Sequence, residues 1–226
     1  MKNSKFFAEN KKSVIVTLTG IIVMILLTVT KVVPSSTIAG IAVFVGIAFF
    51  FITEAVAKTH GAESGLRFNT IPSDLKKPGV IILMLLPIVT VTATCLIGNL
   101  IFSGEYVTHV MGRTSAMLSL DKIASLIVQL IIAAFGEEIA FRGFFFGKTE
   151  KMFPSLLCAV VSSAVFAAGH IAAGNAGIVA FDIATIFIDS MIYSAVYHKT
   201  ENCLISTFSH ILSNAWALTF MSICFV

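Results

Sequence analysis

The sequence predicts an all-α, polytopic transmembrane bundle of about seven or eight helices. Of its 226 residues, 57% are hydrophobic and only 12% are charged, whereas a soluble domain carries about 25% charged residues. The apolar runs are long and continuous, which is typical of membrane-spanning helices and unlike the short alternating segments of a transmembrane β-barrel. The composition therefore indicates an integral membrane protein that is surrounded by the lipid bilayer.

The formal net charge of +3 is too small to indicate nucleic-acid binding. The cysteines stand singly in apolar runs without the CxxC spacing of a metal or redox site. We expect them to be small buried side chains without disulfide or metal roles. They are Cys95, Cys158, Cys203 and Cys224.

Apolar segments bounded by polar residues predict the individual helices. They cover residues 14–33, 37–57, 79–102, 121–146, 155–171, 176–198 and 203–225. Residues 58–78 contain glycine and proline breakers, and we expect this loop to lie at the membrane interface. The chain is thus predicted to consist of a three-helix membrane region, residues 1–120, and a core, residues 121–226. We see no internal repeat.

The connection between the third and fourth segments, residues 103–120, is polar and contains Arg113. We predict no membrane helix there. The histidines at helix ends and in loops, His60, His109 and His198, are expected to be solvated.

Lysine and arginine are enriched in the cytoplasmic flanks of membrane helices. Of the 15 Lys and Arg residues, only Lys31, Arg113 and Lys122 flank the outer ends if the N-terminus lies inside. The other twelve flank the inner ends. This bias predicts a cytoplasmic N-terminus and a C-terminus on the outer side.

Polar groups inside apolar helices are energetically costly and therefore mark candidate functional sites. The set comprises Glu137, Glu138, Arg142, His170, Asp182, Asp189, His210 and Asn214. Glu138 and Arg142 are four residues apart, so we expect a structural ion pair on one helix face. Glu137 lies about 100° around the helix and needs another partner. Asp182 and Asp189 share a face, where they either line a cavity or bind Lys and Ser side chains.

Three predicted helices bring polar side chains to a similar depth. Counting from the inner turns, Glu137 is level with His170, and Asn214 lies about 21 Å in at 1.5 Å per residue. His210 lies one turn shallower than Asn214 and shares its helix face. Phe166 precedes His170 by four residues, so its ring can pack against the imidazole.

Such a set of side chains can hydrolyse a peptide bond. A glutamate in an apolar site can act as general base on water, and a histidine can carry the proton to the leaving amine. A second histidine and an asparagine amide can donate hydrogen bonds to an oxyanion. Alternatively, Glu137, His170 and His210 could bind Zn²⁺ and activate water through the metal. The sequence pattern leaves both alternatives open.

These residues resemble the CAAX-protease and bacteriocin-processing family of intramembrane proteases (CPBP, or Abi). The first family motif, Glu-Glu-x-x-x-Arg, corresponds to residues 137–142, and the second, Phe-x-x-x-His, to residues 166–170. The third, His-x-x-x-Asn, corresponds to residues 210–214. Their order and spacing fit the family, and the resemblance covers about residues 123–216.

The resemblance implies an intramembrane endopeptidase that cleaves membrane-associated peptides or proteins within a polar cavity among the fourth to seventh helices. It implies that Glu137 and His170 activate water and that His210 and Asn214 stabilise the oxyanion. The supporting residues would be Glu138 and Arg142. A metal-free glutamate mechanism follows from the resemblance, and hence no cofactor, with zinc as the alternative.

The compact chain resembles bacterial members of this family, so we expect a bacterial plasma-membrane protein with a substrate that is not prenylated. Bacterial members are connected with bacteriocin immunity or peptide maturation. A non-proteolytic immunity or scaffold protein is therefore the main rival prediction. A proton-coupled transporter is weaker, because the two halves of the chain show no repeat symmetry.

Overall fold

The structure is a computed structural model, and it describes residues 10–30, 38–58, 65–115 and 123–225. The predicted region boundary at residues 120 and 121 and the predicted solvated residue His60 lie outside these ranges. Within them the chain is helical, with short turns between the helices, and this confirms the prediction of an all-α bundle.

Each predicted apolar segment corresponds to a helix of the structure. The long helices are α2 (Lys11–Thr30), α3 (Ile38–Ala57), α5 (Val80–Ile101), α7 (Ile123–Glu138), α9 (Ser155–Ala168), α10 (Ala176–Thr200) and α11 (Cys203–Cys224). The short elements are η2 (Phe68–Thr70), α4 (Ile71–Leu75), α6 (Glu105–Ser115), η3 (Ile139–Phe146) and α8 (Gly147–Thr149).

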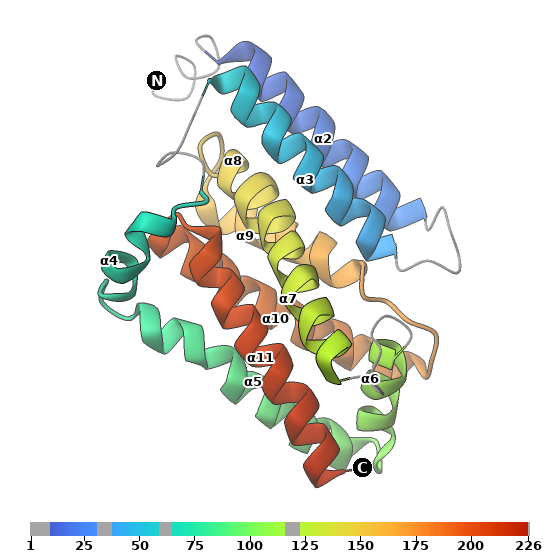
Figure 1. The fold of residues 1–226 in the computed structure, drawn as a ribbon. Coiled ribbons are helices and arrows are strands. Elements are labelled where there is room, and N and C mark those ends of the chain that lie inside the picture. The colour runs from blue at the N-terminus through green and yellow to red at the C-terminus, as the bar shows by residue number, and fades with distance from the viewer. Residues whose placement is uncertain (1–9, 31–37, 59–64, 116–122, 226) are drawn as a thin grey trace.

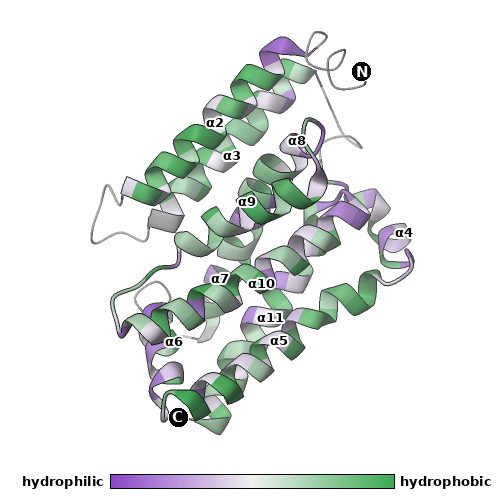
Figure 2. Cartoon of the chain, turned by 180° about the vertical axis from the view of Figure 1, so that it is seen from behind, coloured by the Kyte–Doolittle hydropathy of each residue, from purple (hydrophilic) through white to green (hydrophobic). Residues whose placement is uncertain are grey.

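Five helical segments of the described chain are long and apolar enough to cross a membrane. They are α2, most of α3, α5, α10 and the continuous segment Ala124–Thr149, which joins α7, η3 and α8. α9 is apolar but has only 14 residues. Figure 2 shows that apolar residues dominate the long helices, whereas hydrophilic residues gather around α4 and α6.

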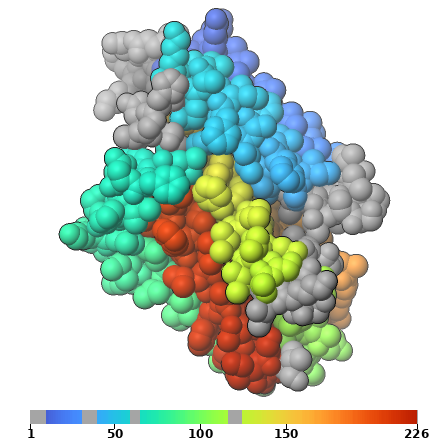
Figure 3. Space-filling view, viewed as in Figure 1, coloured from blue at the N-terminus to red at the C-terminus, as the bar shows by residue number. Residues whose placement is uncertain are grey.

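The N-terminal hairpin and two short helices lie around the other helices of the bundle. α2 and α3 form a hairpin on one side of the bundle, α4 lies at one end, and α6 lies at the other end near the C-terminus (Figure 1). α5, α10 and α11 pack against one another. α7 and α11 lie side by side on the face shown in Figure 3. This arrangement brings the polar parts of α7 and α11 together.

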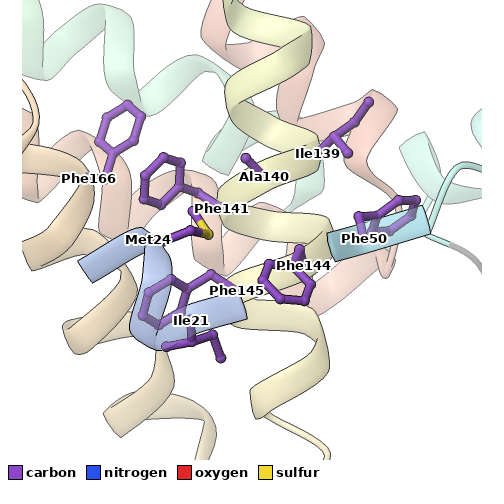
Figure 4. Packing of buried hydrophobic residues seen from close by; sticks show 9 residues of the cluster. All are labelled: Ile21, Met24, Phe50, Ile139, Ala140, Phe141, Phe144, Phe145 and Phe166. Atoms are coloured by element: carbon purple, nitrogen blue, oxygen red, sulfur yellow. The ribbon is translucent and has the colours of Figure 1, made fainter. Parts of the chain in front are cut away.

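The segment that follows the two glutamates is a π-helix, η3, which the apolar pattern did not predict. All eight of its residues are buried. Phe141, Phe144 and Phe145 pack against Met24 of α2 and Phe50 of α3, as Figure 4 shows. The N-terminal hairpin therefore holds η3 in place, and with it the end of α7 that carries the glutamates.

Residues 105–115 and the end of α9 differ from the sequence predictions. Residues 105–115 form helix α6, although a polar connection was predicted, because Tyr106, Val107 and Val110 give this segment a buried apolar face. The helix predicted to reach residue 171 ends at Ala168, and a turn follows it.

A polar clamp joins α4 to the turn between α10 and α11. The Asn202 side chain donates hydrogen bonds to Asp74 at 3.0 Å and to the Arg67 carbonyl at 2.9 Å, and Lys77 pairs with Asp74 at 2.9 Å. Burial acts to raise the pKa of Asp74, but hydrogen bonds from Asn202, Lys77 and Thr70 outweigh it and lower the pKa. The clamp fixes the start of α11 and lies outside the cavity described below.

Candidate active site

Polar side chains from several helices converge on a cavity of about 180 Å³. Glu137, His170, His210 and Asn214 all line it. They come from the end of α7, the turn after α9 and the middle of α11. The cavity was expected among the fourth to seventh helices, but α5 and α6 line it as well.

Glu137 lies in the last turn of α7, and only 8% of its surface is exposed. Its Oε2 atom lies 3.6 Å from Nε2 of His210. This separation exceeds that of a direct hydrogen bond. Both atoms therefore remain open to a water molecule or a substrate in the cavity.

The neighbouring Glu138 is fully buried and does not line the cavity. Its Oε1 lies 3.0 Å from Nη1 of Arg142, so the predicted ion pair is present. The same oxygen lies 3.0 Å from Nδ1 of His210. Arg142 also donates from Nη2 to the Ser190 hydroxyl at 2.7 Å and to the Ser190 carbonyl at 3.0 Å. We call Glu138, Arg142 and Ser190 the brace.

The brace fixes the orientation and tautomer of His210. A carboxylate paired with arginine can only accept a hydrogen bond, so Nδ1 of His210 carries the proton and Nε2 faces the cavity. The ring of Tyr193 stacks on the imidazole, with 4.6 Å between centroids and 21° between planes. Tyr193 also lies beneath the Arg142 guanidinium, 5.3 Å from its centre. The imidazole is thus held from one edge and from one face.

His170 is held by the residue four positions before it. Its Nδ1 lies 2.9 Å from the carbonyl oxygen of Phe166, and the two rings are 4.7 Å apart. A carbonyl only accepts, so Nδ1 carries the proton and Nε2 of the neutral ring keeps its lone pair. His170 is one of the residues that line the cavity, and its Nε2 atom is the basic nitrogen of the ring.

Asn214 lies one turn after His210 on α11 and is partly buried. Both residues line the cavity. In the described part of the chain, no hydrogen bond holds the Asn214 side chain, so its amide is available to a ligand.

The sequence indicated Asp182 as a candidate residue but not its partners on α6. Asp182 of α10 is buried, and its Oδ2 lies 3.0 Å from Nε of Arg113 and 3.6 Å from Nε2 of His109. His109 was expected to be solvated, but α6 places it against Asp182 with only 9% of its side chain exposed. His198 is 56% exposed and pairs with Glu150, as befits a residue at a helix end.

Asp189 lies two turns after Asp182 and also lines the cavity. Its carboxylate contacts the hydroxyl of Thr90 on α5. Both aspartates line the cavity, as one of the two alternatives predicted. Their partners are Arg113, His109 and Thr90, and not the Lys and Ser side chains of the other alternative.

In the described residues, no three His, Cys, Asp or Glu side chains are arranged to hold a metal ion. Nδ1 of His170 contacts a carbonyl and Nδ1 of His210 contacts Glu138, which leaves two Nε2 atoms and Glu137 as potential ligands. As placed, these donors do not form a zinc site, so we assign no catalytic step to a metal.

Comparison with known proteins identifies the region that carries this site. A model of the family described as type II CAAX prenyl endopeptidase Rce1-like matches residues 119–216, a range that contains all three motifs. No curated protein and no solved structure matches the chain. Together with the apolar helices, the match supports an integral membrane protease in general. The predicted resemblance of residues 123–216 to the CPBP intramembrane proteases is thereby confirmed.

Proposed function

We propose that this protein is an intramembrane endopeptidase that hydrolyses peptide bonds of membrane-associated peptides or proteins. The observation that carries this proposal is the convergence of Glu137, His170, His210 and Asn214 on one cavity within an apolar bundle. The family match of residues 119–216 supports the same reaction class.

In the proposed reaction, Glu137 acts as general base and removes a proton from water, which attacks the carbonyl carbon of the scissile peptide bond. The unprotonated Nε2 of His170 accepts a hydrogen bond from the same water and orients it. The proton then passes to the leaving amine as the carbon–nitrogen bond breaks, which regenerates the carboxylate of Glu137.

The tetrahedral intermediate carries a negative charge on the former carbonyl oxygen. The Asn214 amide and Nε2 of His210 are assigned as donors to this oxyanion. Because Nδ1 of His210 already donates to Glu138, Nε2 donates only when the ring is an imidazolium.

The test is cleavage of peptides by the purified protein in lipid nanodiscs. Glu137→Gln and His210→Ala should each abolish cleavage while the amount of protein in the membrane stays near that of the wild type. Full activity in both variants would instead support a non-proteolytic immunity or scaffold protein.

The metal alternative has its own measurement. Glutamate catalysis predicts that activity survives a strong chelator at saturating concentration. Loss of activity that is restored only by added Zn²⁺ would overturn the glutamate mechanism. Comparing membrane proteomes of cells that express the wild type or Glu137→Gln would then identify substrates.

A further inference from the structure

Among the described residues that line the cavity, Arg113 carries the only permanent positive charge. It comes from α6, the helix that the sequence did not predict. A guanidinium in an apolar bundle is costly, and one partner carboxylate does not use all of its five N–H donors. The N–H groups of Arg113 that Asp182 does not contact can donate hydrogen bonds to a ligand in the cavity.

The contact with Asp182 occupies one edge of the guanidinium. Nη2 of Arg113 donates a hydrogen bond to Oδ1 of Asp182 at 3.4 Å, and Nε lies 3.0 Å from Oδ2 as an ion-pair contact without a hydrogen bond. This side-on arrangement leaves both N–H groups of Nη1 and one N–H group of Nη2 directed away from the carboxylate. The Arg113 side chain is 16% exposed and that of Asp182 is 3% exposed, so the arginine is the more accessible of the two.

The balance of charge selects the chemistry of the group that binds there. Asp182 already neutralises Arg113, and the cavity contains two further carboxylates, Glu137 and Asp189. A further anion in this small volume would be repelled by these two carboxylates. A neutral carbonyl oxygen accepts the same hydrogen bonds without this repulsion.

We infer that Arg113 is a substrate-binding residue that donates from Nη1 to a backbone carbonyl oxygen of the peptide in the cavity. Asp182 is a positioning residue that holds the guanidinium edge-on, and His109 packs against Asp182 from the same helix as Arg113. The inference rests on the proposed function for the identity of the ligand, a peptide. The α6 side of the cavity would then bind the main chain of the peptide and not its C-terminal carboxylate.

The test measures peptide binding in the Glu137→Gln background, where turnover is not required. The probes are two pools of fluorescently labelled apolar decapeptides, one with free C-terminal carboxylates and one with C-terminal amides. Arg113→Lys keeps the charge beside Asp182 but loses the planar fork of donors. We expect Kd to rise about tenfold for both pools, the size of one lost hydrogen bond to a charged donor.

The matched control is Arg67→Lys, because Arg67 also pairs with a carboxylate but does not line the cavity. It should leave both Kd values unchanged. If Arg113→Lys does not fold, the neutral pair Arg113→Gln with Asp182→Asn should give the same loss of binding. In the enzyme with Glu137 intact, Arg113→Lys should raise KM about tenfold with little change in kcat.

The outcomes are distinct. Weaker binding of the acid pool alone would show that Arg113 binds a carboxylate and would overturn the inference. Unchanged binding of both pools, or no binding of either pool to the parent protein, would overturn it as well. Absence of cleavage by the wild type would contradict the proposed function, whereas Arg113-dependent peptide binding would still stand.

Discussion

Glu137 and Glu138 follow one another in the chain and are both buried, yet they lie in different surroundings. Glu138 belongs to the brace, where Arg142 and Nδ1 of His210 both lie 3.0 Å from one of its oxygens. Glu137 belongs to the cavity, where Nε2 of His210 lies 3.6 Å from its Oε2 atom. The glutamate at position 138 is thus fixed by its partners, whereas the glutamate at position 137 is available to a ligand.

The difference shows how an apolar bundle can contain a reactive carboxylate. The polar atoms of the brace contact one another and fix the imidazole of His210. The polar atoms that line the cavity remain available to a ligand. If this division is correct, substitutions in the brace should affect stability first, and substitutions in the cavity should affect activity first.

The largest effect on stability is expected from Glu138→Gln. Removing one partner of a buried ion pair leaves Arg142 uncompensated and should cost about 3–5 kcal/mol of unfolding free energy. Glu137→Gln makes the same chemical change one residue away and should leave stability close to that of the wild type. Unfolding of both variants by SDS titration in mixed micelles measures the difference.

The double variant Glu138→Gln with Arg142→Met is the control for this prediction. Removing both charges should cost less than removing one, because no unpaired charge remains. Equal destabilisation by Glu137→Gln and Glu138→Gln would contradict the division between cavity and brace.

The next largest effect is expected in activity. Asn214→Ala removes a proposed oxyanion donor and should lower kcat by about 100- to 1,000-fold, with little change in stability. Asn202→Ala is the matched change at the start of the same helix, where the amide belongs to the clamp with Asp74. Asn202→Ala should lower stability and leave kcat nearly unchanged. A loss of kcat in Asn202→Ala together with a loss of stability alone in Asn214→Ala would contradict the roles given to the two amides.

A smaller effect is expected from Asp74→Asn in the clamp, at about 1–3 kcal/mol of unfolding free energy. The lowered pKa of Asp74 means that its contribution is present above the unfolded value, about pH 3.9, and is lost as pH falls through the folded value. The stability difference between wild type and variant should therefore shrink below roughly pH 4. A difference that does not depend on pH would show that the carboxylate charge is not involved.

Much of the fold could be predicted because apolar length alone identifies helices in a membrane protein. The Glu138–Arg142 pair was likewise predictable, since a spacing of four places both side chains on one face. α6 was not, because a helix of 11 residues with an overall polar composition owes its burial to contacts with α5 and α10. The contact of His109 with Asp182 depends on that helix and was missed with it.

The site could be predicted as a set of residues but not as an arrangement. Spacing indicates that His210 and Asn214 share a face, whereas it does not indicate which nitrogen of His210 meets Glu138. The π-helix depends on a change in the hydrogen-bonding pattern of the backbone that the apolar pattern does not encode. Tyr193 gave no signal, because one aromatic side chain in an apolar helix is ordinary.

Tyr193 supplies the smallest of the predicted effects. Its ring stacks on His210 and lies beneath Arg142, so it acts as a positioning residue for both the cavity and the brace. Tyr193→Leu removes the stacking, worth about 0.5–1.5 kcal/mol, and should lower kcat by up to about tenfold with KM nearly unchanged. Tyr193→Phe keeps the ring and should restore kcat; failure of this rescue would mean that the hydroxyl, and not the stacked ring, orients the imidazole.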